Sequence, residues 1–261
     1  SLGIDIFAQD GSGLTSGDQI LIASAAVEDS VPDVAKAKEL GCARMTRAEL
    51  LAELFNASTR SVAVGGTSGK STVTGMIGWI LTDAGLDPTI MNGGVMKNFV
   101  SADTPFASAR VGHGDVFVSE VDESDGSIAL FQPEIAVLNN ISLDHKSLDE
   151  LRGLFGDFAR KAKHAIWNAD DIESVALLAP MNLKNAISFG FSDRADVRAI
   201  DVVEMPLGSH FTLSVKGERL PVTLQVPGRH NISNALAAIA AAQALGVPMA
   251  QAIHGIERFA G

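Results

Sequence analysis

A glycine-rich segment carries residue types that bind phosphate: Gly66-Thr67-Ser68-Gly69-Lys70-Ser71-Thr72. Glycines let backbone N–H groups approach a phosphate chain closely, and a helix that begins here adds positive potential. Lys70 is placed to reach the β- and γ-phosphates, and the Ser71 hydroxyl to ligate Mg²⁺. The strict pattern has a glycine where this chain has Val64. The segment predicts a P-loop for ATP and Mg²⁺, with a glycine-rich turn that binds no ligand as the alternative.

An acidic segment follows the apolar run Asp115–Val121 and contains Glu120, Asp122, Glu123 and Asp125. Carboxylates this close together repel one another unless water or a metal ion screens them. In open α/β sheets, ligands bind beyond the carboxyl ends of the strands, where both this segment and the P-loop would lie. Hard cations prefer oxygen donors, so Glu120 is a candidate Mg²⁺ ligand. The alternative is a solvated acidic loop.

A third apolar run, Ile135–Leu138, ends in Asn139-Asn140-Ile141-Ser142-Leu143-Asp144-His145. It would deliver His145 to the same sheet edge, although such a histidine can also be a surface or capping residue. Three strands that each end in a ligand-type residue are typical of a phosphoryl-transfer site with two metal ions. We therefore predict Lys70, Glu120 and His145 as catalytic residues, and Ser71, Glu120 and His145 as metal ligands.

The elements that must position these residues are predicted from apolar spacing and from helix start and stop signals. Residues 1–58 are expected to form part of an N-terminal Rossmann-like domain, with a strand at Gln19–Ala23 and helices at Pro32–Leu40 and Thr46–Phe55. Residues 59–261 are expected to form the central ATP-binding P-loop domain. Its strands are predicted at 61–64, 115–120, 134–138 and 165–167, and its helices at 70–84, 148–163, 231–245 and 248–259.

Residues 196–226 alternate between apolar and polar, which predicts antiparallel strands, as a small sheet beside the main one. The predicted fold class is therefore α/β. A mostly parallel P-loop sheet is flanked by helices and joined by a small antiparallel sheet, and part of a Rossmann-like domain precedes it.

The composition of the 261 residues limits the function classes. The net charge is -11 and no run of Lys and Arg offsets it, which argues against a nucleic-acid or anionic-membrane binder. Cys42 is the only cysteine, so an internal disulfide is excluded, and we expect a buried, inert thiol. The longest apolar run is too short to span a bilayer and no secretory signal is visible, so we expect a cytoplasmic protein.

With these motifs in place, the chain resembles the Mur ligases, which use ATP to add amino acids to the UDP-muramic acid precursor of peptidoglycan. The resemblance rests on the GTSGKST loop, on the SEVDESD strand end with the later Asp144-His145 pair, and on the PGRHNISNALAA segment. The last two look most like the branch that adds alanine to muramate and its relative that attaches a ready-made tripeptide. The family's loop is similarly relaxed at the position of Val64.

The resemblance implies roles at matching positions. Lys70 would bind the β/γ-phosphates, Glu120 and His145 would bind metal, and His230, Asn231 and Asn234 would contact adenine and ribose. From the residues alone, the last segment is a helix start with asparagine capping. Other members use a carbamylated lysine downstream of the histidine. Here Arg160 stands near that place with Lys161 and Lys163 beside it, and no such lysine can be assigned.

The implied reaction activates a carboxylate as an acyl phosphate, which an amine then attacks. Its partners are ATP, a UDP-muramic acid-type acceptor and an amino acid or peptide. Asn92–Gly94 and Lys97–Phe99 are candidates for the acceptor pocket, with a plain surface loop as the alternative. These ligases usually have three domains. We expect this chain to lack the UDP-binding half of the first and the whole third, and therefore to bind nucleotide weakly and not to turn over alone.

Other functions remain open at this point. Within the ligases, a cyanophycin-synthetase-like or folylpolyglutamate-synthetase-like enzyme would share the loop and differ in its first substrate. A P-loop kinase or NTPase would share the loop but would not need the GRHNISNA segment. A ligase-like fragment that binds nucleotide without catalysis is the third alternative.

Overall fold

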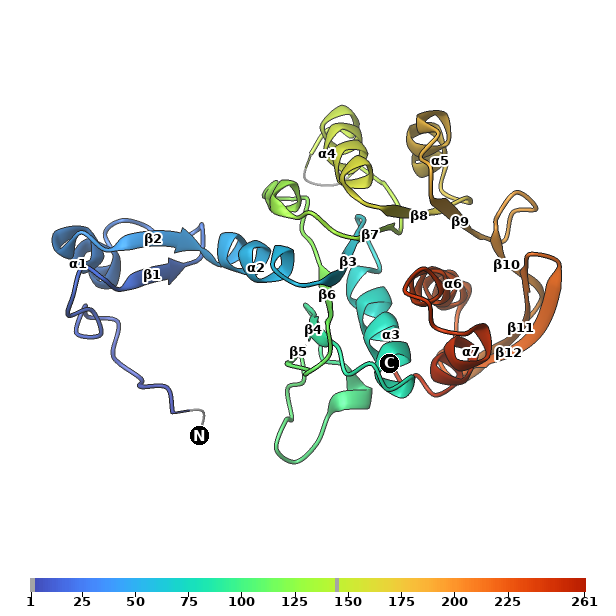
Figure 1. Cartoon of the computed structure of the whole chain (residues 1–261), viewed down its shortest axis with the longest axis horizontal. Coiled ribbons are helices and arrows are strands. Elements are labelled where there is room, and N and C mark those ends of the chain that lie inside the picture. Colours follow the sequence, from blue (N-terminus) through green and yellow to red (C-terminus); the bar gives the residue numbers. More distant parts are fainter. Residues whose placement is uncertain (1–2, 144–145) are drawn as a thin grey trace. The chain divides into compact units, whose positions relative to one another are not determined.

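The computed structural model describes residues 3–143 and 146–261, and the chain divides into two compact units at Leu54/Phe55 (Figure 1). The smaller unit has strands β1 (Ile20–Ala23) and β2 (Ala43–Thr46), which pair in parallel. Helix α1 (Pro32–Leu40) connects them, and α2 (Arg47–Asn56) follows β2. The sequence predicts this β-α-β-α order and a parallel pairing for this part of the chain, and the structure has both.

Local sequence explains where these helices begin and end. Proline stands in the first turn of α1, where its missing N–H costs nothing, and Gly41 ends the helix in a left-handed conformation with a φ of 73°. At the start of α2, Glu49 N donates to the Thr46 hydroxyl and Thr46 N donates to the Glu49 carboxylate. The prediction of a buried Cys42 is wrong: the thiol is half-buried and donates to Ser16 O, 3.3 Å away.

The larger unit contains a ten-stranded mixed sheet in its described residues, in the order β12-β11-β10-β9-β8-β7-β3-β6-β4-β5. Neighbours from β10 to β4 pair in parallel, whereas β4 with β5, β10 with β11, and β11 with β12 pair antiparallel. The strands are β3 (Arg60–Gly65), β4 (Thr89–Met91), β5 (Ala109–Arg110), β6 (Val116–Glu120), β7 (Ile135–Leu138), β8 (His164–Asn168), β9 (Ala186–Gly190), β10 (Val197–Met205), β11 (Gly208–Val215) and β12 (Glu218–Leu224).

The antiparallel strands predicted in residues 196–226 are present, but they continue the main sheet instead of forming one of their own. β10 pairs in parallel with β9 through Val197 and Phe189, and this pairing joins the two parts. The α/β class and the mostly parallel core are confirmed.

Helices cover both faces of this sheet, with α4 and α5 on one face and α3, α6 and α7 on the other (Figure 1). Their bounds are α3 (Lys70–Asp83), α4 (Leu148–Lys161), α5 (Ile172–Leu178), α6 (Arg229–Ala244) and α7 (Met249–Glu257), and three short 3₁₀ helices are η1 (Lys97–Phe99), η2 (Ser127–Leu130) and η3 (Ala179–Met181). No helix in the described part of the chain is long and apolar enough to cross a membrane.

Small side chains let α3, α6 and α7 pack closely. All eight residues from Ala235 to Ala242 are fully buried, and all but Leu236 and Ile239 are alanines. A Cβ on Gly255 of α7 would lie 3.0 Å from the Ile80 Cα of α3, tighter than most Cβ contacts, so glycine favours this close approach. The packing fixes α3 and α6, and their first turns face the carboxyl edge of the sheet.

Candidate nucleotide-binding site

The central strand β3 brings the P-loop between two neighbouring strand ends. β3 pairs with β6 on one side and with β7 on the other, with Val64 opposite Glu120 and Gly65 opposite Leu138. The P-loop, the acidic segment and the Asn139–Ile141 segment therefore leave the sheet at the same edge, as the sequence predicts. Parallel strands produce this arrangement because their carboxyl ends share one edge.

Glycine is required at two positions of the loop. Gly66 has a φ of 131° and Gly69 a φ of 80°, conformations that residues with a Cβ rarely adopt. A Cβ on Gly69 would lie 2.4 Å from Asn139 Nδ2 and 3.0 Å from Asn234 Oδ1. The loop thus passes closer to its neighbours than any side chain allows, and α3 begins at the next residue, Lys70.

Two asparagines after β7 hold the loop in this shape. Asn140 Oδ1 accepts from Ser68 N at 2.9 Å and from the Thr67 hydroxyl at 2.8 Å, and Asn140 Nδ2 donates to Ser68 O. Asn139 Nδ2 donates to Ser68 O at 2.9 Å, while its buried Oδ1 has no hydrogen-bond partner among the described residues. Asn139 and Asn140 are not among the predicted site residues, although they follow the same strand as His145 and the same argument applies to them.

The charged groups of the site are already paired with one another. Lys70 Nζ donates to Gly66 O at 2.8 Å and forms an ion pair with Glu123, 3.0 Å from Oε2. The Ser71 hydroxyl donates to Glu120 Oε2 at 2.7 Å. Glu123 is only 4% exposed, so its carboxylate is a buried part of the site and not a solvated surface group. The structure therefore brings Lys70, Ser71 and Glu120 together and adds Glu123 to them.

Asp125 plays a different part in the acidic segment. It is exposed, and its carboxylate accepts from Ser127 N at 2.8 Å, which closes the turn before η2. The four carboxylates of the sequence pattern are therefore not one equivalent cluster.

The donor set fits Mg²⁺ and a phosphate chain as far as the described residues extend. The hydroxyl of Ser71 and the carboxylate of Glu120 are oxygen ligands of the kind that Mg²⁺ prefers, and they lie side by side. His145, predicted as a further ligand, lies outside the described residues. Within those residues, no group of three or more His, Cys, Asp and Glu side chains is arranged to hold a metal ion.

The GRHNISNA segment forms the start of α6, and part of it reaches the P-loop. Asn234 Oδ1 accepts from Asn139 Nδ2 at 3.1 Å, which connects the helix to the loop. The Asn231 side chain donates to Pro227 O at 2.8 Å, and the helix has Gly228 before it with no side-chain cap. The alternative of asparagine capping is therefore wrong. His230 is exposed beside Gly228.

A cavity of about 310 Å³ adjoins the loop. Ser71 and Thr72 line it together with Asn92, Gly94 and Asn231. The candidate acceptor segment Asn92–Gly94 thus lies at the site.

Gly93 also lies against the predicted metal ligand, because a Cβ on it would stand 2.0 Å from Glu120 Oε1. By contrast, η1 (Lys97–Phe99) serves packing: Phe99 contacts Trp79 edge to face at 5.6 Å, and Asn98 hydrogen-bonds Arg258 O and Ala260 N.

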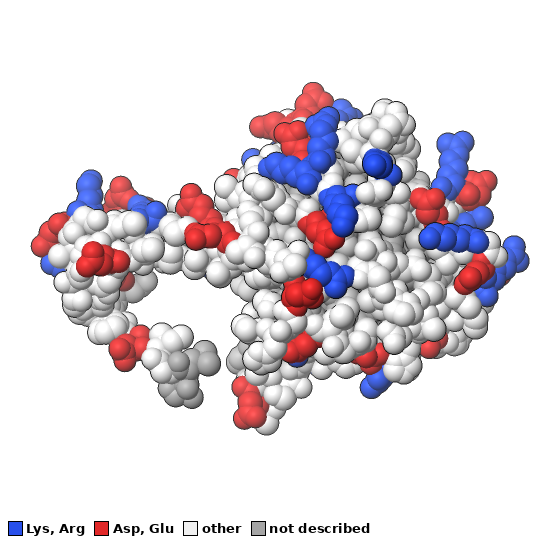
Figure 2. All heavy atoms as spheres, viewed as in Figure 1, with Lys and Arg blue, Asp and Glu red and all other residues white. Residues whose placement is uncertain are grey.

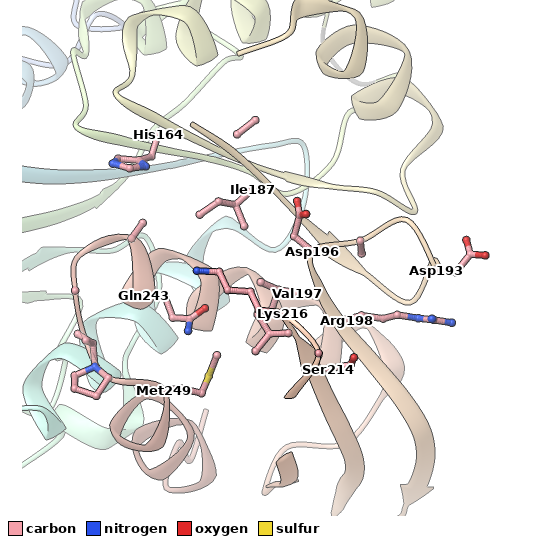
Figure 3. Close-up of a pocket in the computed structure, with 18 residues that line it drawn as sticks. His164, Ile187, Asp193, Asp196, Val197, Arg198, Ser214, Lys216, Gln243 and Met249 are labelled. Atoms are coloured by element: carbon pink, nitrogen blue, oxygen red, sulfur yellow. The ribbon is translucent and has the colours of Figure 1, made fainter. Parts of the chain in front are cut away.

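A second cavity, of about 870 Å³, lies elsewhere in the described residues (Figure 3). It is lined by His164 and Ala186 at the amino ends of β8 and β9, and therefore lies at the edge of the sheet opposite the P-loop. Lys216 and Gln243 point into it, and Asp196 already accepts from Ser188 N and Oγ. Its lining mixes both charges and does not select one ligand class.

The three basic residues near the position of a carbamylated lysine have other roles. Arg160 pairs with Asp157, Lys161 donates to Ala129 O and Lys163 pairs with Glu134. They lie at or just after the end of α4, next to the start of β8 and away from the P-loop edge.

Acidic and basic side chains are interspersed over the described face in Figure 2, which shows no continuous basic surface there. A phosphate chain at this site would thus depend on the loop's backbone N–H groups, on Lys70 and on metal ions.

Comparison with known proteins places this geometry in a family. Residues 64–242 match the family model described as the Mur ligase middle domain. The UDP-N-acetylmuramate–L-alanine ligase of Geotalea uraniireducens is 36% identical and aligns with 100% of this chain and 57% of its own length. That of a Sulfurihydrogenibium species is 37% identical over 99% of this chain and 56% of its own.

Solved structures agree with the family match. The UDP-N-acetylmuramate-alanine ligase of Thermotoga maritima has a TM-score of 0.80 at 26% identity, covering 93% of this chain and 55% of that one. A murein peptide ligase from Psychrobacter arcticus has a TM-score of 0.79 at 27% identity, with the same coverage. The chain thus spans little more than half the length of these relatives.

Proposed function

This chain belongs to the Mur ligase family, and on that premise we propose that it acts as an ATP-dependent carboxylate–amine ligase of the UDP-N-acetylmuramate–L-alanine ligase type. The observation that carries the proposal is the P-loop between β6 and β7, with Lys70 and Ser71 beside the carboxylates of Glu120 and Glu123. The overall reaction joins a carboxylate and an amine and converts ATP to ADP and phosphate.

The residues of the site have defined parts in this proposal. The backbone N–H groups at the start of α3, residues 69–72, and the Lys70 ammonium bind the phosphates, whereas Thr67 N and Ser68 N already donate to Asn140 and shape the loop. Ser71 and Glu120 hold Mg²⁺, with His145 as a further ligand. When bound, ATP supplies the phosphoryl group that activates the carboxylate, and Mg²⁺ neutralises the charge of the phosphates. His230, Asn231 and Asn234 contact the base and the ribose.

The proposed acceptor is a UDP-muramic acid-type carboxylate, and the 310 Å³ cavity beside Ser71 and Asn92 is the proposed place for its reacting end. The amine is L-alanine, with a ready-made peptide as the second candidate. The Psychrobacter relative, named as a murein peptide ligase, supports keeping both. The family match favours ligation over a P-loop kinase activity.

The 261 residues align with about 57% of the length of their relatives. We propose that this chain alone binds nucleotide but does not complete ligation, because the relatives carry further residues that it does not match. Phosphate release by the purified chain that depends on UDP-N-acetylmuramate and L-alanine would contradict this point.

Nucleotide binding is tested by titrating the chain with Mg²⁺ and a non-hydrolysable ATP analogue in a calorimeter. Lys70→Ala should weaken binding at least about tenfold, since it removes a charge-assisted hydrogen bond to phosphate. Lys184→Ala, which removes the same charge from an exposed position, should leave the affinity unchanged. Equal binding by the wild type and Lys70→Ala would refute the site.

Ligation is tested by fusing the chain to the parts of the Geotalea relative that it does not match and following phosphate release. UDP-N-acetylmuramate is the acceptor, and L-alanine is compared with the tripeptide L-alanyl-γ-D-glutamyl-meso-diaminopimelate. A preference for L-alanine supports the proposal, and a preference for the tripeptide supports the second candidate. Phosphate release without any amine would point to an NTPase.

A further inference from the structure

The lysine of the P-loop is held by an ion pair inside the site. Lys70 Nζ lies 3.0 Å and 3.3 Å from the two carboxylate oxygens of Glu123, and it also donates to Gly66 O at 2.8 Å. The Lys70 side chain is 21% exposed and that of Glu123 is 6% exposed. The pair is therefore screened from water far more than a surface ion pair.

The ammonium has little hydrogen-bonding capacity left for a ligand. A lysine has three donors, and three acceptors, Gly66 O and the two oxygens of Glu123, lie within hydrogen-bond distance of its nitrogen. A phosphate that reaches Lys70 must displace the carboxylate, because two anions at one ammonium repel each other. Binding of a phosphate at this position is thus an exchange of one anion for another.

Glu123 is fixed in its place by the backbone around it. Val121 N donates to Val64 O at 3.0 Å and ties the segment to β3. Gly126 N donates to Glu123 O at 3.1 Å, and Gly126 has a φ of 81°, so a tight turn closes directly after the carboxylate. These hydrogen bonds hold the backbone of Glu123 near Lys70, so the exchange for a phosphate involves the side chain and not the whole segment.

We propose that Glu123 is a positioning residue that occupies the phosphate place at Lys70 in the nucleotide-free site. It neutralises the ammonium, holds it against Gly66 O and must be displaced by the β- and γ-phosphates of the nucleotide. Glu123 therefore lowers the affinity for ligands that carry these phosphates and leaves AMP unaffected, since the P-loop lysine contacts the β- and γ-phosphates. This inference rests on the proposed nucleotide site.

The test measures affinities of the full chain for the Mg²⁺ complex of the non-hydrolysable ATP analogue, and for AMP, by calorimetry. Glu123→Gln keeps the shape and removes the charge, and it should bind the analogue roughly tenfold more tightly, the factor that corresponds to one charge-assisted hydrogen bond. The affinity of Glu123→Gln for AMP should stay within about twofold of the wild-type affinity, because AMP has no β- or γ-phosphate to contact Lys70. Asp125→Asn is the matched control, because it removes the same charge from the same segment and keeps the acceptor for Ser127 N.

The outcomes separate the two proposals. If wild type binds the analogue through Lys70 and Glu123→Gln binds it no more tightly, the role of Glu123 is refuted while the nucleotide site stands. If the analogue does not bind wild type, or binds Lys70→Ala equally well, the nucleotide site itself fails. An equal gain in Asp125→Asn would refute a specific effect of Glu123. A merely structural glutamate would give weaker binding and a lower melting temperature on substitution, which also contradicts the proposal.

Discussion

Replacing Gly69 by alanine tests the shape of the P-loop in two ways. The φ of 80° places this residue in the left-handed region, which costs a residue with a Cβ about 1–2 kcal/mol. The new Cβ would stand 2.4 Å from Asn139 Nδ2 and 3.0 Å from Asn234 Oδ1, both on buried residues. Overpacking of this kind costs about 1–3 kcal/mol. We therefore expect Gly69→Ala to lower the free energy of unfolding by about 2–5 kcal/mol.

The assay is equilibrium unfolding in urea, followed by circular dichroism, with Gly153→Ala as the control. Gly153 lies inside α4, and a Cβ added to it would have no other atom within 4 Å, so alanine there should stabilise the chain by about 0.5–1 kcal/mol. Replacing glycine by alanine should thus lower the free energy of unfolding at Gly69 and raise it at Gly153.

A double-mutant cycle identifies the cause of the effect. Asn139→Ala removes the side chain that the new methyl group would meet, so the loss in the double mutant should be smaller than the sum of the two single losses by at least about 1 kcal/mol. Two additive losses would show that the contact with Asn139 does not constrain the loop. A loss below about 1 kcal/mol for Gly69→Ala alone would refute the left-handed loop as well.

Two further predictions concern hydrogen-bonded carboxylates on the surface of the larger unit. The pKa of Asp87 is lowered mainly by the hydrogen bond from the backbone N–H of His113, and next by the Arg110 side chain. The stabilisation of the fold by the ionised Asp87 is therefore complete above the ordinary pKa of about 3.9, and it is lost as the pH falls through the lower pKa of the folded state. Unfolding measured between pH 5 and 2 should therefore show a smaller loss of stability in Asp87→Asn than in wild type, and an identical loss would contradict this assignment. At the start of α4, Ser147→Ala removes the capping box with Glu150 and should cost about 1 kcal/mol in urea unfolding. Because the Ser147 side chain is the main cause of the lowered pKa of Glu150, that pKa should rise when measured by NMR titration, and an unchanged value would refute the reasoning.

Most of the larger sheet could be predicted from the sequence because its strands are short apolar runs bounded by polar or glycine residues. β3, β6 and β7 are predicted within one or two residues, and their order along one edge follows from the parallel arrangement. The two-residue β5 and three-residue β4 were not predicted, since so few residues show no periodicity. β9 and α5 were not predicted either, and the seven residues of α5 are too few to show a clear helical period.

The candidate site was predictable in its residue types but not in its pairings. The motif points to Lys70 and Ser71, and the strand end points to Glu120. That Glu123, and not Asp125, meets Lys70 depends on the turn at Gly126, which one sequence does not specify. The support by Asn139 depends on the close passage of Gly69, which is a property of the packed fold.

The position of β3 in the sheet has a consequence for synthesis of the chain. β3 is the first strand of the large sheet to be made, yet its partners β6 and β7 lie at residues 116–120 and 135–138. Until the ribosome has delivered residue 138, at least one edge of this buried apolar strand has no partner, and open apolar edges promote aggregation. The hairpins β10–β12, in contrast, pair with their immediate neighbours in the chain. Among the described strands of the large sheet, the one that carries the P-loop thus waits longest for its partners.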